Sequence, residues 1–231
     1  KTALLAALVT FTVVTLSAPT LVVLGASFTA GKIIAFPPQG LSLRWYAAIA
    51  NGPDLREAFV RSLYVAAVCT VIAVPVGTFA GIAMAKYRVR FERLLQLYLL
   101  LPFTVPLIGS GIGMMLLFGR AGVLGHLWPI GLACCVINLP FMIWAVSGSV
   151  NALDPDLEAA AANCGAPPLQ AFFSVTLPAV MPGVITGSLL MFILALNEFL
   201  VSLLLVDARI VTLPVQIYNS IRSIITPDLA A

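Results

Sequence analysis

Five long apolar runs limit this chain more than any other feature of its sequence. They cover residues 3–28, 62–85, 94–118, 123–150 and 180–206, and the only acid among them is Glu198. Each run is longer than the roughly 20 helical residues that cross a hydrocarbon core about 30 Å thick. Because backbone polar groups in lipid must be satisfied within the segment, we expect every run to be helical. The pattern predicts an all-α integral membrane protein, a polytopic helical bundle in which residues 1–231 form one transmembrane domain.

The composition excludes several other classes of protein. Apolar residues make up 61% of the chain and charged residues 9%, whereas a soluble domain has about 45–50% and about 25%. The net charge is +3 without a block of basic residues, so membrane lipid is an expected partner and nucleic acid is not. The four cysteines form no C-x-x-C pair and are interpreted as buried small apolar residues. The sequence contains no metal-ligand spacing, nucleophile motif or phosphate-binding loop, which predicts a chain that is not an enzyme and holds no cofactor or metal of its own.

A basic segment between the second and third runs predicts the orientation of the chain. Its four cations are Lys86, Arg88, Arg90 and Arg93. Such clusters stay on the cytoplasmic side of a membrane, so residues 29–61 form an external loop. Within that loop, the aromatic and apolar residues from Leu43 to Ile49 predict a short helix that lies at the level of the lipid headgroups.

The end of the chain is typical of a helix start. Thr226 can cap a helix whose first turn contains Pro227, because proline needs no backbone hydrogen bond there. We therefore expect a sixth apolar span after residue 231.

Glycine and proline occur within several runs at informative positions. Pairs of glycines four residues apart stand at 77 and 81, at 109 and 113, and at 183 and 187, a spacing that lets two helix backbones approach closely. Pro102 and Pro106 interrupt the third run. They are either accommodated by ordinary packing in the bundle, or they open a bend beside a solute path.

Residues 154–178 predict a helical hairpin on the cytoplasmic side. Asp154 is a good cap, Pro155 suits the first helical position, and Gly165 can end the first helix. We expect a second short helix to begin near Pro167 or Pro168, to present Leu169, Phe172 and Phe173 on one face, and to stop before Pro178. Exposed apolar residues on such a hairpin indicate a docking surface for a soluble partner.

This segment resembles the EAA loop of binding-protein-dependent ABC transporter permeases. The pattern of that loop is E-A-A, three residues, G, nine residues, then I-x-L-P, and Gly165, Val175, Leu177 and Pro178 fit the spacing. Ala159 stands where the family has its glutamate, and Glu158 lies one residue earlier. Four further stretches resemble the spermidine/putrescine permease group, namely "FPPQGLSLRWYAAI", "SLYVA", "LNEF" and "TLPVQIYNSIRSIITPDLAA".

The resemblance implies the transmembrane domain of a type I ABC importer in a bacterial inner (plasma) membrane. Its implied partners are a second permease subunit that is a different chain, two cytoplasmic ATPase subunits that bind ATP and Mg, and a periplasmic or extracellular solute-binding protein. A sixth helix follows the "TP" segment in that group. The residues implied in coupling to the ATPase subunits are Glu158, Ala159, Gly165, Leu169, Phe172, Phe173, Leu177 and Pro178.

Glu198 is the candidate substrate residue, because a charge at membrane depth costs several kcal/mol and is functional by default. Asn197 and Phe199 flank it, and together they could hold an alkylammonium group by charge, hydrogen bond and cation–π contact. Alternatively, Glu198 is protonated or bonded to a neighbouring helix and only shapes the pore. Asp207 attracts cations or is a solvated loop acid. Further candidates for lining the path are Trp144, Tyr98 and Phe103.

We therefore expect a permease subunit that forms half of the path for a polyamine or a related amine or amino-acid solute. The alternatives are an ABC permease for ferric iron, thiamine or sulfate, a secondary transporter driven by an ion gradient, and a membrane scaffold without a path. A secondary transporter needs its own ion site among intramembrane acids, and a single acid is thin support for one. A cytoplasmic docking hairpin favours the ATPase-coupled permease.

Overall fold

The computed structural model describes residues 2–31, 37–38, 40–87, 92–154, 156–207 and 210–223. The regular elements within these ranges are all helices, as the apolar runs predict. The chain divides into two compact units, which are described separately: residues 1–59 with 213–231, and residues 60–212.

The first unit contains a long apolar helix and two short ones. These are α1 (Thr2–Ser27), α2 (Arg44–Asn51) and α11 (Leu213–Ser223). The hydroxyl groups of Ser27 and Tyr46 lie 2.7 Å apart, and the indole N–H of Trp45 donates to the carbonyl of Thr29 at 3.1 Å. These contacts tie α2 to the end of α1. The short helix predicted within residues 43–49 is therefore present, and its position at the headgroups stays a prediction.

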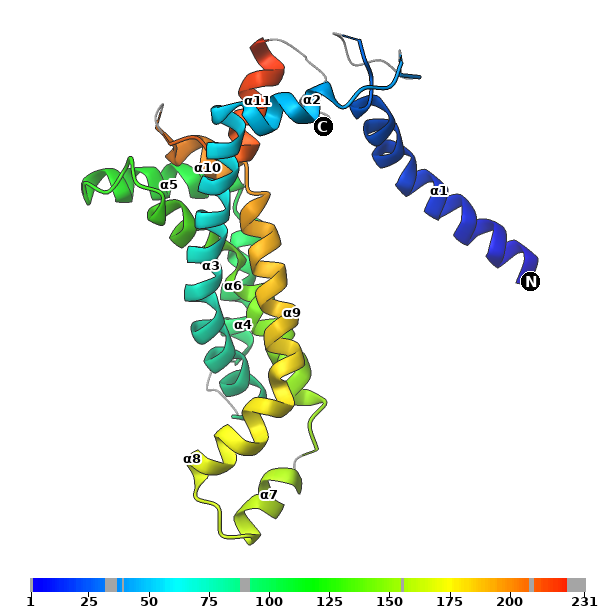
Figure 1. Ribbon diagram of the computed structural model, residues 1–231. Helices are drawn as coiled ribbons and strands as arrows, with labels where there is room; N and C mark the ends of the chain where they lie inside the picture. Colours follow the sequence, from blue (N-terminus) through cyan, green and yellow to red (C-terminus); the bar gives the residue numbers. More distant parts are fainter. Residues whose placement is uncertain are drawn as a thin grey trace. The chain divides into compact units, whose positions relative to one another are not determined.

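The second unit is built on three long helices that lie side by side (Figure 1). They are α3 (Pro53–Lys86), which enters from the first unit, α6 (Trp128–Asn151) and α9 (Leu177–Leu196). A Cβ atom at Gly81 would lie 2.9 Å from the carbonyl oxygen of Ile143, and one at Gly183 would lie 2.7 Å from that of Ala145. Glycine at these positions lets α3 and α9 approach α6 from two sides, as the spacing predicts.

The third glycine pair behaves differently. A Cβ atom at Gly109 or Gly113 would meet no atom within 4 Å, whereas one at Gly111 would lie 2.6 Å from Cδ1 of Leu204. The prediction that Gly109 and Gly113 mediate close packing is therefore wrong within this chain, and Gly111 takes that role.

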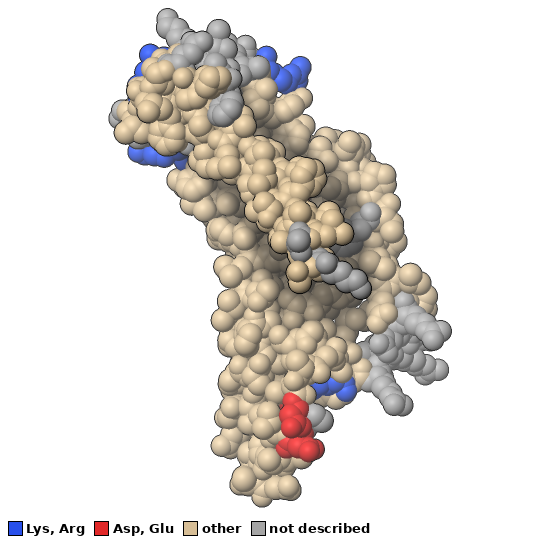
Figure 2. All heavy atoms as spheres, turned by 90° about the vertical axis from the view of Figure 1, so that its right-hand side faces the viewer, with Lys and Arg blue, Asp and Glu red and all other residues tan. Residues whose placement is uncertain are grey.

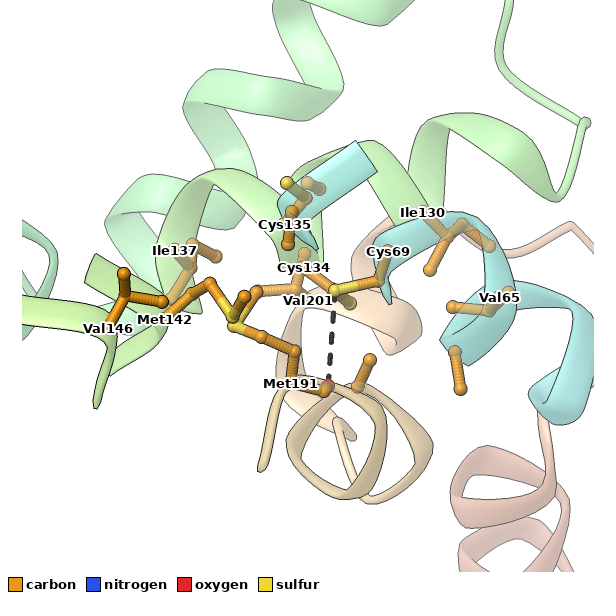
Figure 3. Packing of buried hydrophobic residues seen from close by; sticks show 14 of the residues in the cluster. Val65, Cys69, Ile130, Cys134, Cys135, Ile137, Met142, Val146, Met191 and Val201 are labelled. Atoms are coloured by element: carbon orange, nitrogen blue, oxygen red, sulfur yellow. Dashed lines mark hydrogen bonds between the residues drawn. The ribbon is translucent and has the colours of Figure 1, made fainter. Parts of the chain in front are cut away.

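Sulfur-containing side chains fill the centre of the second unit (Figure 3). Cys69, Met142 and Met191 come from α3, α6 and α9 and are fully buried. Cys134 and Cys135 are buried beside them, as predicted. Cys164 is exposed, so the prediction that all four cysteines are buried is wrong for this one. It follows α7 (Asp156–Asn163), outside the packed helices.

Four of the predicted spans have different bounds from the apolar runs. The helix of the run at 62–85 already begins at Pro53, so the end of the predicted loop at residues 29–61 is helical. The run at 94–118 forms α4 (Glu92–Thr104) and α5 (Leu107–Arg120), whose axes meet at 88°, because Val105 precedes a proline and is disfavoured in the helical region. The run at 123–150 becomes helical only at Trp128, after Gly122 and Gly125 have taken positive φ angles of 69° and 84°. The run at 180–206 breaks after Leu196 and resumes as α10 (Leu200–Leu205).

Among the described residues, four helices are long and apolar enough to cross a membrane, or five if α4 and α5 count as one broken span. The surface agrees with burial in lipid. Figure 2 shows a wide area without charged side chains. In the lower part of that view, an acidic patch and a smaller basic patch lie side by side. The predicted helix start at Thr226 and Pro227 lies outside the described residues.

Candidate functional site

The predicted hairpin projects from one end of the three long helices (Figure 1). It comprises α7, α8 (Pro168–Ala171) and the wide turn η1 (Phe172–Thr176). A carboxylate oxygen of Asp154 accepts the backbone N–H of Asp156 at 3.0 Å, as expected of a cap. Gly165 ends the first helix with a φ of +83°, a conformation that glycine adopts without strain. Pro155, predicted at the first helical position, lies outside the described residues.

The second helix of the hairpin does not stop before Pro178, and this prediction is wrong. The backbone runs from α8 through η1 directly into α9. The N–H of Leu177 donates to the carbonyl of Phe172, five residues back. This wide turn comes immediately before Pro178, which has no N–H to donate. The hairpin is consequently continuous with a membrane-spanning helix.

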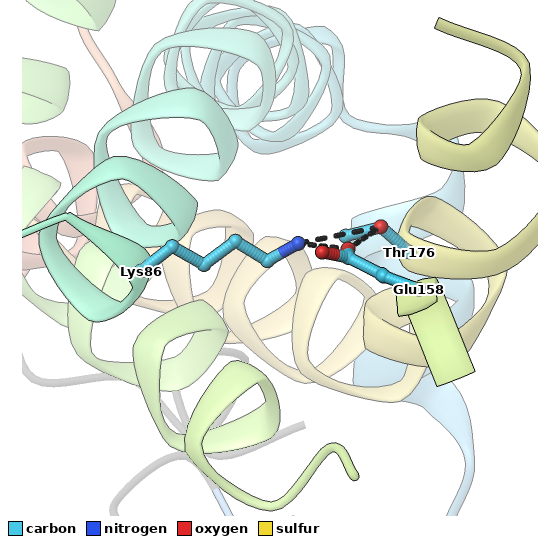
Figure 4. A network of polar contacts seen from close by, with 3 residues as sticks. All are labelled: Lys86, Glu158 and Thr176. Carbon is cyan, nitrogen blue, oxygen red and sulfur yellow. Dashed lines mark hydrogen bonds and ion pairs between the residues drawn. The ribbon is translucent and has the colours of Figure 1, made fainter. Parts of the chain in front are cut away.

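A polar cluster joins the hairpin to the end of α3 (Figure 4). Glu158 of α7 forms an ion pair with Lys86 of α3 and accepts a hydrogen bond from Thr176 of η1. The ammonium of Lys86 also donates to the Thr176 hydroxyl at 3.4 Å. Hydrogen bonds from Lys86 and then Thr176 lower the pKa of Glu158 below its ordinary value of 4.5, against a smaller opposing effect of burial.

This cluster places the hairpin on the same side as the basic segment. The hairpin has no Lys or Arg of its own, so its orientation was predicted only by counting spans. Lys86 is the cation of that segment whose side chain the structure describes; Arg88, Arg90 and the side chain of Arg93 lie outside the described residues.

The apolar residues of the hairpin differ in exposure. Leu169 and Phe173 are 74% and 60% exposed. Phe172 instead stacks on Phe79 of α3, with ring centroids 6.2 Å apart. Phe172 also meets Phe173 edge to face, with ring centroids 5.1 Å apart, so the two rings lie together as predicted, but Phe172 is half-buried because α3 covers one side of its ring. Ala159, Gly165 and Pro178 are exposed, and Leu177 is half-buried.

A cavity of about 450 Å³ lies where two spans break. Its lining includes Pro102 and Pro106 beside the bend between α4 and α5, and Glu198 in the break between α9 and α10. The bend at these prolines thus lies beside a cavity, and the interpretation that this cavity belongs to a solute path stays a prediction. A carboxylate oxygen of Glu198 accepts the N–H of Val201 at 3.1 Å, so this side chain also caps α10.

Asn138 is a lining residue that sequence reasoning missed. It is buried in the middle of α6, and its Nδ2 donates to the carbonyl of Cys134 at 3.0 Å. Asn138 lines the same cavity as Glu198, and its carboxamide oxygen is a hydrogen-bond acceptor. A lone amide within an uncharged apolar run is the signal that could have identified it.

The other candidates for the path are dispersed. Asn197 is exposed and donates from Nδ2 to the carbonyl of Ile193 at 2.9 Å, on its own helix. Phe199 is half-buried beside Glu198, and Asp207 is exposed after α10. Trp144 lines a separate cleft of about 360 Å³, and Tyr98 is 68% exposed. Phe103 belongs to α4, and its side chain lies outside the described residues.

The broken spans, the intramembrane cavity and the helical hairpin define a multi-pass membrane transport subunit. The chain belongs to the family described as the inner membrane component of binding-protein-dependent transport systems, whose model matches residues 73–226.

Three relatives illustrate the range of this family. The putrescine transport system permease protein PotI of Escherichia coli (strain K12) is 30% identical, over 94% of this chain and 79% of its own length. The molybdenum transport system permease protein ModB of Mycobacterium tuberculosis (strain H37Rv) is 32% identical, over 85% and 81%. The spermidine/putrescine transport system permease protein PotC of Haemophilus influenzae is 26% identical, over 84% and 75%.

The fold has a counterpart among solved structures. A crystal structure of a bacterial ABC transporter involved in the import of the acidic polysaccharide alginate matches 94% of this chain and 78% of its own, with a TM-score of 0.68 and 19% identity. The chain is thus a permease subunit of an ABC importer, located in the inner membrane with multiple spans.

Proposed function

We propose that this permease subunit forms half of the translocation path for a positively charged amine, such as a polyamine or a related amino-acid derivative. The observation that carries the proposal is the carboxylate of Glu198, which lines a cavity at the meeting point of two broken spans. The names of two relatives, PotI and PotC, support the same class of solute.

The chemistry of the cavity suits an ammonium group. The Glu198 carboxylate supplies the charge, and the carboxamide oxygen of Asn138 is a second acceptor. Phe141 adds an aromatic ring to the same lining, and aromatic rings attract cations electrostatically. Away from water these interactions are stronger than they are in solution.

An oxyanion is the second candidate, because the relative ModB is named for molybdenum transport. The described residues that line the cavity include no Lys or Arg. A carboxylate accepts hydrogen bonds and repels an anion, so this lining favours a cation over molybdate or sulfate. Ferric iron and thiamine are also cationic, and the solute tests must include them.

The hairpin at residues 154–178 couples ATP hydrolysis by the partner subunits to movement of the helices. Leu169 and Phe173 present exposed apolar surface to the cytoplasmic ATPase subunits, which bind ATP and Mg. The ion pair between Glu158 and Lys86 transmits a push on the hairpin to α3, and the continuous backbone transmits it to α9. An external solute-binding protein and a second, different permease chain complete the transporter.

The test uses the complete transporter reconstituted in lipid with its binding protein. Uptake and ATP hydrolysis are measured with putrescine, spermidine, 4-aminobutyrate, thiamine, ferric iron and molybdate. We expect Glu198→Gln to lower amine uptake about tenfold or more, since losing a charge-assisted hydrogen bond costs roughly 1.5–3 kcal/mol. The control is Asp54→Asn, which removes an exposed acid at the start of α3, outside the cavity lining.

Three outcomes would count against parts of the proposal. Unchanged amine uptake in Glu198→Gln would reject the cavity as the amine site and leave the importer assignment intact. If molybdate alone stimulated ATP hydrolysis and uptake, the proposal that the solute is an amine would be rejected. Uptake without any associated ATPase would favour an ion-coupled transporter.

A further inference from the structure

One side of α6 carries a row of side chains that the proposed function does not use. Phe141, Trp144, Ser147 and Asn151 follow one another at intervals of three, three and four residues, which places them along one side of a helix. Other residues of α6, such as Met142 and Val146, are buried against the glycines of α3 and α9. The row lies outside these glycine contacts, although Ser147 at its edge bonds to the carbonyl of Gly81 in α3.

Two separate cavities lie along this row. Phe141 belongs to the lining of the cavity that holds Glu198, and Trp144 belongs to the next cleft, of about 360 Å³. The two rings meet edge to face, with centroids 5.9 Å apart. Six residues separate Asn138 from Trp144, a rise of about 9 Å along the helix. The aromatic pair thus stands between the Glu198 cavity and the second cleft.

The second cleft is polar and uncharged. Its polar side chains are those of Gln96 from α4 and of Ser147 and Asn151 from α6, and the described residues of its lining include no acid or base. Ser147 donates to the carbonyl of Gly81 at 3.0 Å, so its hydroxyl is held in place. Two carboxamide oxygens and the face of an indole are groups that bind an ammonium ion.

A third cleft, of about 540 Å³, continues the row toward the hairpin. It shares Ala85 and Asn151 with the second cleft, and its lining includes Lys86 and Glu158. The series of cavities therefore runs from Glu198 to the end of the bundle that the basic segment predicts to be cytoplasmic.

We propose that the cleft of Trp144, Gln96 and Asn151 is a second amine site, of low affinity, through which the solute leaves the Glu198 cavity. The inference rests on the proposed function, because it takes the solute to be an amine. Conduction along a path requires binding that is strong enough for entry and weak enough for release. A neutral site after a carboxylate site meets that requirement, and the Phe141–Trp144 pair is the barrier between them.

Cysteine labelling of the complete transporter tests the site directly. In a Cys164→Ser background, Ser147→Cys places a thiol in the cleft without altering Trp144 or Asn151, and the three native cysteines that remain are buried. Inside-out vesicles are treated with a membrane-impermeant maleimide, with and without putrescine. At ten times the dissociation constant of the amine, occupancy of the cleft slows labelling about tenfold. The matched control is Ala152→Cys, which is exposed directly after α6 and is not part of the cleft lining.

The outcomes separate this inference from the proposed function. The second site is supported if putrescine protects Ser147→Cys, molybdate does not protect it, and Ala152→Cys is not protected by either solute. An unreactive thiol at position 147 rejects a cleft open to the cytoplasm, and labelling that putrescine leaves unchanged rejects the amine site. If Glu198→Gln abolishes amine uptake while Ser147→Cys is unprotected, only the second site fails.

A second variant pair tests the indole. Trp144→Phe keeps an aromatic face, so we expect it to retain both protection and most of the transport. Trp144→Leu removes that face, and we expect the putrescine concentration needed for protection to rise several-fold, by the roughly 0.5–2 kcal/mol that cation–π contacts contribute. Equal protection in the two variants would reject a role for the ring.

Discussion

At the scale of single residues, the most informative contact is the one between Lys86 and Glu158. Sequence spacing placed Glu158 one residue away from the family's glutamate position. The sequence therefore gave no reason to expect an ion-pair partner for it in this chain. The structure pairs it with a lysine 72 residues earlier and with Thr176. Because the Glu158 side chain is 37% exposed, solvent screens the pair and its contribution to stability stays within about 1 kcal/mol.

The pH dependence of the pair follows from the direction of the pKa shift. The pKa of Glu158 is lowered in the folded protein, so its ion pair contributes stability above the unfolded pKa of about 4.5. That contribution is lost as the pH falls through the lower folded pKa. We expect wild type to unfold at a higher temperature than Glu158→Gln at pH 7, and the difference to shrink as the pH falls below 4.5 and to vanish below the lowered pKa of the folded protein.

Thermal unfolding of the purified transporter in detergent, recorded from pH 7 downward, measures this difference. Lys86→Met is the matched control, because it removes the other partner and must give the same pH profile. A difference between wild type and Glu158→Gln that persists at acid pH would contradict the assignment of the shift to this pair.

At the scale of helices, contacts within the bundle depend on where glycine meets a neighbouring backbone. Gly183 and Gly109 both belong to pairs with the same four-residue spacing. Only the first lies against another helix, where its Cβ would approach the carbonyl oxygen of Ala145. The spacing indicates that close approach is permitted, and the tertiary structure decides whether it occurs.

Alanine substitution separates the two glycines. We expect Gly183→Ala to destabilise the protein by about 1–3 kcal/mol, since a backbone carbonyl cannot move aside and the helices must separate. Gly109→Ala has open space around it and replaces glycine within a helix, so it should be neutral or slightly stabilising. Thermal unfolding in detergent of the two variants measures the contrast, and equal stability would show that α6 and α9 do not pack this closely.

At the scale of the whole molecule, exposed apolar surface has two different surroundings. The apolar side chains of α1 are exposed along a helix long enough to span a membrane, where lipid covers them. Leu169 and Phe173 are exposed on a hairpin that extends from the end of the long helices. Surface of this kind outside the membrane is typical of a protein interface.

Substitution at the hairpin tests its coupling role. We expect Leu169→Asp to lower solute-stimulated ATP hydrolysis and uptake about tenfold or more, because burying a carboxylate in an apolar interface is costly. Leu169→Met keeps the apolar surface and should behave like wild type. Both variants should unfold at the same temperature, since the side chain contacts solvent in the isolated subunit. Normal coupling in Leu169→Asp would remove this residue from the interface.

The sequence alone determined the fold class, the apolar segments and the hairpin, because these depend on local composition and on cap residues such as Asp154 and Gly165. Hydropathy, however, measures only how apolar a segment is, so it could not place the breaks at Val105 and after Leu196 within the runs at 94–118 and 180–206. Those breaks follow from proline sterics and from a carboxylate that caps a new helix.

Only the tertiary structure decided which residues meet. Asn138 joins Glu198 at one cavity, Trp144 lines another, and Lys86 reaches Glu158. These contacts join residues that are far apart in the chain, and their partners depend on how the helices pack. A single sequence carries the periodicity of each helix but not the direction that its sides face.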